Sequence, residues 1–241
     1  MQKTTLIGIT GLYCAGKNHI AQMFEKRGIP ALDLDKLGHE AIHLEKEQLV
    51  NNFGKEILGA DGLPDRRLLG KAVFGNPEAL AALEMIIHPV VNRLSEEWTA
   101  RQTGLCVINA ALLHKSSLLN RLDLIIAVRS PLPVRFFRAW RRDKLSLREL
   151  IKRLSSQKDF PRYTAKITTG NEGAQLFSGT ADIYTIENSG FSGSRRTAVT
   201  LEKRIDAILE GLSYGKEKIT AGCGFGGCVS GDRVQHRNSL Y

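Results

Sequence analysis

Short apolar runs alternate with longer stretches of helical spacing along most of the chain. Apolar runs of strand length lie at residues 5–10, 30–34, 105–110, 122–128 and, more weakly, 182–186. Helical spacing covers residues 18–27, much of 37–103, and 133–142. Strands that are apolar throughout and alternate with helices are typical of a parallel sheet covered on both faces. The pattern therefore predicts an α/β fold.

Local signals mark several helix boundaries. Asn76-Pro77 is placed as an N-cap followed by a first-turn proline. Ser146 and Glu149 have the spacing of a capping box, which predicts a helix from there to about residue 157. From residue 213 onward glycines and polar residues replace any periodicity. We therefore predict a folded domain over residues 1–212 and a flexible tail over 213–241.

Charge adds one local feature to this picture. The 241 residues include 34 Lys and Arg against 25 Asp and Glu, a net charge of +9. Between Arg129 and Lys166 twelve basic residues stand with three acidic ones, so this segment carries the whole excess. A basic balance is typical of nucleic-acid or membrane-surface binding. Because the charge is confined to one segment, we expect it to serve a local purpose, and we predict no specific nucleic-acid partner.

Other function classes find little support. No apolar run is long enough to span a membrane, and residues 1–10 enter a strand without a signal-peptide layout, so we expect a cytoplasmic protein without membrane association. Cys14 and Cys106 lie far apart and are not placed as a disulfide framework. Cys223, Cys228 and His236 are irregularly spaced for a zinc site.

A glycine loop carries the clearest chemistry. Residues 11–17 match the phosphate-binding pattern G-x-x-x-x-G-K, between an apolar strand and a helix. In that setting backbone N–H groups and a helix N-terminus converge on a phosphate, whereas a plain glycine turn with an exposed lysine needs neither neighbour. The predicted nucleotide-binding residues of this loop and the next helix are Gly11, Leu12, Tyr13, Cys14, Ala15, Gly16, Lys17, Asn18 and His19.

Asn18 departs from the loop pattern. It stands where Ser or Thr would place a hydroxyl on Mg²⁺. Its amide oxygen can hold the metal weakly, through water, so we expect a weak Mg²⁺ site. Cys14 admits two interpretations, a reactive thiol near a helix N-terminus or a small loop residue, and the second is favoured.

Two carboxylates follow the second predicted strand. Asp33 and Asp35 lie at its carboxyl end, which in an open parallel sheet faces the ligand crevice. Such groups can orient an attacking hydroxyl or accept its proton. The alternative is that one of them, Asp33 more readily, caps the next helix.

Further segments extend a family resemblance. Ile7 to Gly11 with the glycine loop, Gly28 to Asp35, Asp61 to Leu68 with Val73-Phe74, Leu83 to Pro89, Arg138 with Arg142-Asp143, Gln157, and Ala181 to Gly190 follow one another as in dephospho-coenzyme A kinases. Together they span roughly residues 4–212. The number and order of these segments make the chain resemble that family.

The resemblance implies a three-layer P-loop kinase core with a parallel sheet. It further implies a helical substrate-binding part at about 36–103 and a basic lid at about 129–166. The implied reaction is ATP-dependent phosphorylation of the ribose 3′-hydroxyl of dephospho-coenzyme A, the last step of coenzyme A synthesis. A lid rich in arginine suits phosphate contacts, and its closure would exclude water.

The resemblance also implies roles for single residues. Asp35 would act on the ribose hydroxyl with support from Asp33, and Lys17 would hold the β- and γ-phosphates. Arg142 and Arg138 would come from the lid, and Asn188 would lie near adenine. On the acceptor side the matching positions are Arg66 and His88.

The sequence departs from the family at Asn109, Ala111, His114 and Lys115 as well as at Asn18. At Asn109 the family usually has an acidic residue, so two amides replace groups on the metal side. Two alternatives therefore stay open: another small-molecule or nucleotide kinase of the same fold, and a nucleotide-binding homologue with weakened catalysis. A GTPase is disfavoured because no N-K-x-D-type guanine motif is found.

Overall fold

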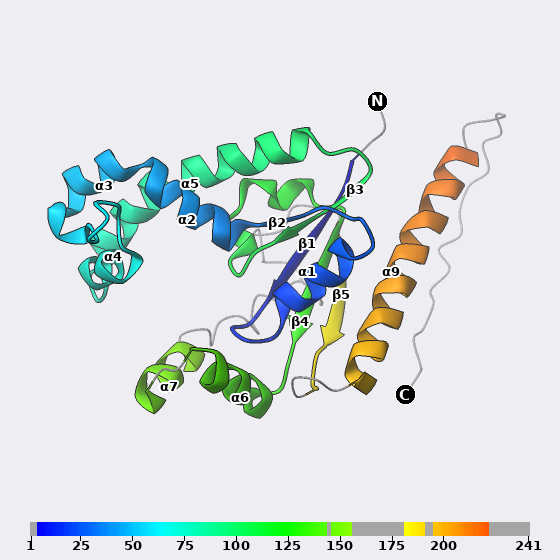
Figure 1. Cartoon of the computed structure of the whole chain (residues 1–241). Helices are drawn as coiled ribbons and strands as arrows, with labels where there is room; N and C mark the ends of the chain where they lie inside the picture. Colours follow the sequence, from blue (N-terminus) through cyan, green and yellow to red (C-terminus); the bar gives the residue numbers. More distant parts are fainter. Residues whose placement is uncertain (1–3, 144–145, 156–180, 191–194, 222–241) are drawn as a thin grey trace, which may run out of the picture. The chain divides into compact units, whose positions relative to one another are not determined.

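The computed structural model describes residues 4–143, 146–155, 181–190 and 195–221. Its centre is a five-stranded sheet in the order β2-β3-β1-β4-β5 (Figure 1). The strands are β1 (Thr5–Gly11), β2 (Ala31–Asp33), β3 (Leu105–Asn109), β4 (Leu124–Arg129) and β5 (Asp182–Glu187). All neighbouring pairs are parallel. The predicted α/β fold and all five predicted strands are confirmed.

Burial explains why the three central strands were easy to find. β1 is buried at every position and β4 at all but its last. β3 and β4 contribute to an apolar cluster beneath the sheet, whose buried members are Leu6, Cys106, Ile108, Ala110, Leu113, Leu118, Leu119, Leu122 and Ile125. β5 is largely exposed and β2 is only partly buried, since each lies at an edge. Only the central strands β1, β3 and β4 are therefore continuous apolar runs in the sequence.

The register brings the carboxyl ends of the strands to one edge. Asp33 pairs with Asn109 at the ends of β2 and β3, and Gly11 pairs with Val128 where β1 enters the glycine loop. From β1, the chain continues to β2 and β3 on one side of the sheet and later to β4 and β5 on the other side. The carboxyl end of β1 is therefore a topological switch point. Ligands of open α/β sheets bind at such points.

Four helices between β2 and β3 form the predicted helical part. They are α2 (Leu34–Leu44), α3 (Lys46–Phe53), α4 (Arg66–Val73) and α5 (Pro77–Ala100), with a 3₁₀ turn at Lys55–Ile57 (Figure 1). The Asn76 side chain accepts from two first-turn N–H groups, which confirms the predicted start of α5. A separate apolar cluster holds these helices together: Ala41, Leu49, Ile57, Leu69, Ile87 and Val90.

The basic segment starts with two helices. α6 spans Leu132–Asp143 and α7 spans Leu147–Ser155. The capping box is confirmed, because the Ser146 hydroxyl and backbone N–H both donate to the Glu149 carboxylate. The predicted contributions of Gln157 and of the later basic residues lie outside the described residues.

The chain divides into two compact units, residues 1–202 and 203–241. The remaining elements are α1 (Lys17–Glu25), the 3₁₀ turns Leu113–Lys115 and Ser117–Arg121 (η3), and α9 (Arg195–Ala221). α9 continues past residue 212, so the first part of the predicted tail is helical. Among the described helices none is long and apolar enough to cross a membrane.

Candidate active site

The glycine loop has the geometry of a phosphate cradle. β1 ends at Gly11 and α1 begins at Lys17, so the loop joins a buried strand to a helix N-terminus as predicted. Gly16 is the N-cap with φ 102°, and Cys14 also has a positive φ of 58°. Because glycine has no side chain to cap the helix, no side-chain cap occupies the N–H groups of Lys17 and Asn18 at the start of α1, which can face an anion.

Arginines of α6 hold this loop by its carbonyl oxygens. Arg138 donates to the carbonyl oxygens of Cys14 and Ala15 at 3.3 and 3.1 Å, and Arg135 Nε donates to that of Tyr13 at 2.9 Å. Because these loop carbonyl oxygens point toward α6, peptide N–H groups of the loop can point the opposite way, as in an anion-binding nest. The two arginines therefore stabilise the loop in its phosphate-binding shape.

Asn188 ties the same loop to the end of β5. Its Nδ2 donates to the Ala15 carbonyl oxygen at 2.9 Å, and the side chain is buried. Arg138 in turn donates to the Asn188 Oδ1 at 2.9 Å and to the Gly190 carbonyl oxygen at 2.6 Å. One guanidinium thus joins the phosphate loop to the segment predicted to lie near adenine.

Substituting Gly16 with Ala tests this packing. A Cβ at Gly16 would collide with Asn188 Nδ2, and the positive φ would be strained as well. We expect Gly16→Ala to weaken ATP binding about a hundredfold, the sum of strain and clash. The measurement is the ATP dissociation constant by isothermal titration calorimetry.

Gly62→Ala is the matched control for Gly16→Ala. Gly62 has φ +71°, and a Cβ added there would meet nothing within 4 Å among the described residues, so it carries the strain without the collision. The ATP affinity of this variant should equal that of the native chain. Unchanged ATP affinity in Gly16→Ala would show that the loop does not bind the nucleotide in this conformation.

The carboxylates after β2 take two different roles. Asp33 is the N-cap of α2, where its Oδ1 accepts from the N–H groups of Asp35 and Lys36, so the capping alternative is confirmed. Asp35 is exposed in the first turn, and its Oδ2 lies 3.6 Å from Lys17 Nζ. The structure thus brings the loop lysine and one carboxylate together, with Asp33 fixing the turn that presents it.

Arg66 lies in the same electrostatic neighbourhood. It opens α4 and is exposed. Burial lowers the pKa of His39 on α2, the Arg66 guanidinium lowers it further, and the carboxylates of Asp35 and Asp33 oppose this. Arg66 and the two aspartates therefore act on one shared neighbour. His88 is half-buried within α5, next to the helix-interior Pro89, and no described contact joins it to this group.

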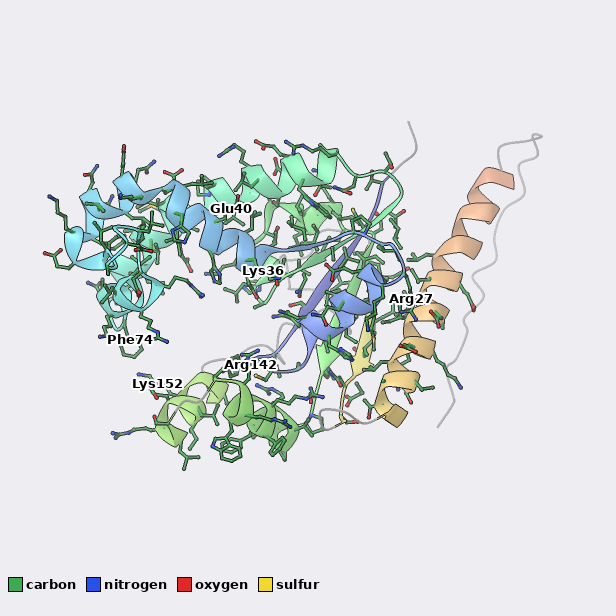
Figure 2. The ribbon with its side chains drawn as sticks, viewed as in Figure 1. Arg27, Lys36, Glu40, Phe74, Arg142 and Lys152 are labelled. Carbon is green, nitrogen blue, oxygen red and sulfur yellow. The ribbon has the colours of Figure 1, made fainter. Side chains whose placement is uncertain are left out.

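Arg142, the other arginine expected to come from a lid, lies against the loop. The Arg142 guanidinium donates to both oxygens of Asp143, at 2.6 and 3.0 Å, and stacks 5.3 Å from the centre of the Tyr13 ring (Figure 2). The Tyr13 hydroxyl also donates to Asp143. A side chain of the phosphate loop thus holds the lid arginine through an aromatic face and a shared carboxylate.

Two loop neighbours have shifted pKa values. Burial raises the pKa of the Cys14 thiol, more than the nearby arginines and Lys17 lower it. The thiol is therefore protonated at neutral pH, and the small-residue interpretation of Cys14 is favoured over a reactive one. His19 is exposed on α1, and partial burial with the charges of Lys26 and Arg138 lowers its pKa.

Two amides lie where the sequence led us to expect a weak Mg²⁺ site. Asn109, at the end of β3, donates from Nδ2 to the Asn18 Oδ1 at 3.0 Å. Among the described residues, no group of three or more His, Cys, Asp or Glu is placed to hold a metal ion. The hydroxyl and carboxylate that hold Mg²⁺ in P-loop enzymes are both missing here. These two residues do not fit direct coordination of Mg²⁺ by the protein.

Sequence reasoning missed two residues of this site. Arg135 is buried at 6% exposure on the loop carbonyls, and Asp143 joins Arg142 to Tyr13. The spacing of Arg135, Arg138 and Arg142 placed them on one helix face, which was a usable signal. The spacing does not show that Arg135 and Arg138 turn toward the loop while Phe137 and Trp140 stay exposed.

Comparison with known sequences agrees with this geometry. The sequence model of the dephospho-CoA kinase family matches residues 5–172. The dephospho-CoA kinase of Anaeromyxobacter dehalogenans is 33% identical over 200 residues, which cover 79% of this chain and 95% of that relative. The dephospho-CoA kinase of Thermus thermophilus is 37% identical over 153 residues, 63% of this chain and 74% of that relative.

Solved structures agree as well. A Thermus thermophilus protein named TT1252 matches with a TM-score of 0.69 and 31% identity, covering 88% of this chain and 99% of that one. The dephospho-CoA kinase from Campylobacter jejuni shares the fold, with a TM-score of 0.52 at 22% identity over 84% of this chain and 97% of that one. From the family match and the full-length relative, the chain belongs to the dephospho-CoA kinase family.

Proposed function

We propose that this protein transfers the γ-phosphoryl group of ATP to the ribose 3′-hydroxyl of dephospho-coenzyme A. The observation that carries the proposal is the pairing of Lys17 with Asp35 at the carboxyl edge of the sheet, 3.6 Å apart. A loop lysine beside a carboxylate joins a phosphate-binding group to a proton acceptor. Family membership supplies the nature of the acceptor.

Asp35 is the group that receives the hydroxyl proton. Its carboxylate is exposed, so an acceptor hydroxyl can reach it, and its backbone is fixed by the Asp33 cap. The Ala111 N–H lies 3.4 Å from Asp35 Oδ1. Lys17 sits on the phosphate side, where its ammonium balances charge on the β- and γ-oxygens as the phosphoryl group moves.

The arginines divide their work in this proposal. Arg138 and Arg135 are positioning residues because the hydrogen bonds described for both include loop carbonyl oxygens. Arg142 is the lid group that meets the transferred phosphoryl, and Asp143 with Tyr13 positions it. Arg66 contributes positive charge on the acceptor side.

The lid also reaches the helical part. Lys152 of α7 lies 3.9 Å from the centre of the Phe74 ring, just after α4 (Figure 2). Contact between these two elements lets the lid close over bound substrates, which excludes water and limits ATP hydrolysis.

An acceptor panel tests the proposal. ADP release is followed with ATP and, in turn, dephospho-coenzyme A, shikimate and nucleoside monophosphates. We expect turnover with dephospho-coenzyme A alone. Turnover only with another acceptor would make the chain a different small-molecule kinase, and ATP binding without any turnover would make it a non-catalytic homologue.

A further inference from the structure

An amide pair occupies the metal side of the phosphate loop. Asn109 is 2% exposed, whereas Asn18 is exposed at the start of α1. The 3.0 Å hydrogen bond from Asn109 Nδ2 to Asn18 Oδ1 joins the end of β3 to the loop helix. The Asn109 side-chain oxygen, Oδ1, is buried and has no hydrogen-bond partner among the described residues. A buried acceptor of this kind calls for a donor such as water.

The chemistry of this pair differs from that of the usual metal site. P-loop enzymes bind Mg²⁺ through a Ser or Thr hydroxyl and a nearby Asp carboxylate. Here both groups are neutral amides, and the Asn18 oxygen already accepts a hydrogen bond. Mg²⁺ gives up its waters reluctantly and favours anionic oxygen ligands. The pair therefore offers hydrogen bonds to water but no ligand charge.

Removing the carboxylate also changes how the nucleotide binds. An anionic group at Asn109 would repel the phosphates of metal-free ATP, and Mg²⁺ would then be needed to bridge the two charges. A neutral pair adds no such repulsion, and the Asp35 carboxylate at the same edge of the sheet is paired with Lys17. The coupling between metal and nucleotide, which is reciprocal by linkage, should be correspondingly small.

We propose that Asn18 and Asn109 uncouple nucleotide binding from the metal in this protein. Because the pair supplies no charged ligand, ATP should bind whether or not Mg²⁺ is present, and any support the pair gives to the metal would be through hydrogen-bonded water. The inference rests on the proposed function insofar as ATP is the ligand. It assigns to the pair a role in metal dependence that is separate from acceptor recognition.

The test compares ATP affinity in excess Mg²⁺ and in EDTA by isothermal titration calorimetry without acceptor. For the native chain we expect similar dissociation constants in the two buffers. The double variant Asn18→Ser with Asn109→Asp restores the hydroxyl and the carboxylate. In that variant Mg²⁺ should tighten ATP binding by about tenfold or more relative to EDTA, a typical effect of a supporting ligand.

A second variant guards against misfolding, because an aspartate at the buried position 109 is costly. Asn18→Asp places the carboxylate on the exposed partner, and it should also gain Mg²⁺ dependence. Asn120→Asp adds the same charge on η3, before the amino end of β4 and therefore at the opposite edge of the sheet. This control should behave as the native chain does. Thermal unfolding of each variant verifies the fold.

Each result decides the inference. A native chain whose ATP affinity rises tenfold or more with Mg²⁺ would overturn it, as would Asn18→Asp and the double variant both remaining independent of Mg²⁺. ATP binding in both buffers without transfer to dephospho-coenzyme A would sink the proposed function and leave this inference standing. A native chain that binds no ATP in either buffer would overturn both.

Discussion

Replacing Asp35 with Asn is expected to lower kcat for phosphoryl transfer to dephospho-coenzyme A by about a hundredfold or more, the usual contribution of a positioned general base. The amide keeps the shape of the carboxylate but cannot accept the hydroxyl proton. The ion pair with Lys17 is lost as well. ATP affinity should change little, because the loop and its arginines are untouched. Steady-state ADP release and calorimetry measure the two quantities.

Asp33→Asn is the comparison variant for Asp35→Asn. Asparagine is as good an N-cap as aspartate, so α2 should start as before and activity should fall much less. Both substitutions remove one negative charge within three residues of each other. Equal losses in the two variants, or full activity in Asp35→Asn, would remove the proposed role of Asp35.

Replacing Arg138 with Lys is expected to weaken ATP binding by about a hundredfold, because a hydrogen bond from a charged donor is worth about 1.5–3 kcal/mol and each 1.4 kcal/mol changes Kd tenfold. The guanidinium serves carbonyl oxygens of the loop and of Asn188 and Gly190 at once. A lysine ammonium cannot reproduce that planar set of donors. The loop carbonyl oxygens would then lose their fixed orientation, and the loop N–H groups would no longer point together at the bound phosphate. Calorimetry with ATP measures the loss.

Arg141→Lys is the matched control on the same helix. Arg141 is exposed, and the same conservative change there should leave ATP affinity unchanged. An Arg138→Lys variant that binds ATP as the native chain does would show that the loop holds its shape without the guanidinium. A loss of the folded state in thermal unfolding would instead place Arg138 among the residues that stabilise the domain.

The sequence predicted the fold well because its central strands are apolar at nearly every position. β1 and β4 are buried along their length, and such runs are readable without any tertiary knowledge. Strand boundaries were less accurate: β2 was predicted at 30–34 and spans Ala31–Asp33, and β4 was predicted at 122–128 and spans Leu124–Arg129. Apolar residues continue into the connecting segments, so the apolar run alone does not mark where pairing begins or ends. α9 runs to Ala221, past residue 212, where the tail was predicted to begin.

The site residues that lie in local motifs next to predicted strands could be predicted from the sequence. Contacts that depend on how distant elements pack could not. The loop, Lys17 and Asp35 lie next to elements that the pattern reveals. The contacts of Arg138 with Asn188, 50 residues away, depend on which face of α6 turns inward, and the sequence pattern does not reveal that. The Asn18 and Asn109 departures were visible in the sequence, but their hydrogen bond was not.

The most direct test of this account is the product formed from dephospho-coenzyme A and ATP by the native chain. Mass spectrometry and ³¹P NMR of the reaction should show one added phosphate, located on the ribose 3′-oxygen, together with one ADP per product. The reaction should vanish in Lys17→Ala, which stays folded but loses the phosphate-binding ammonium. ADP release without a phosphorylated acceptor, or phosphate on any other oxygen, would contradict the account.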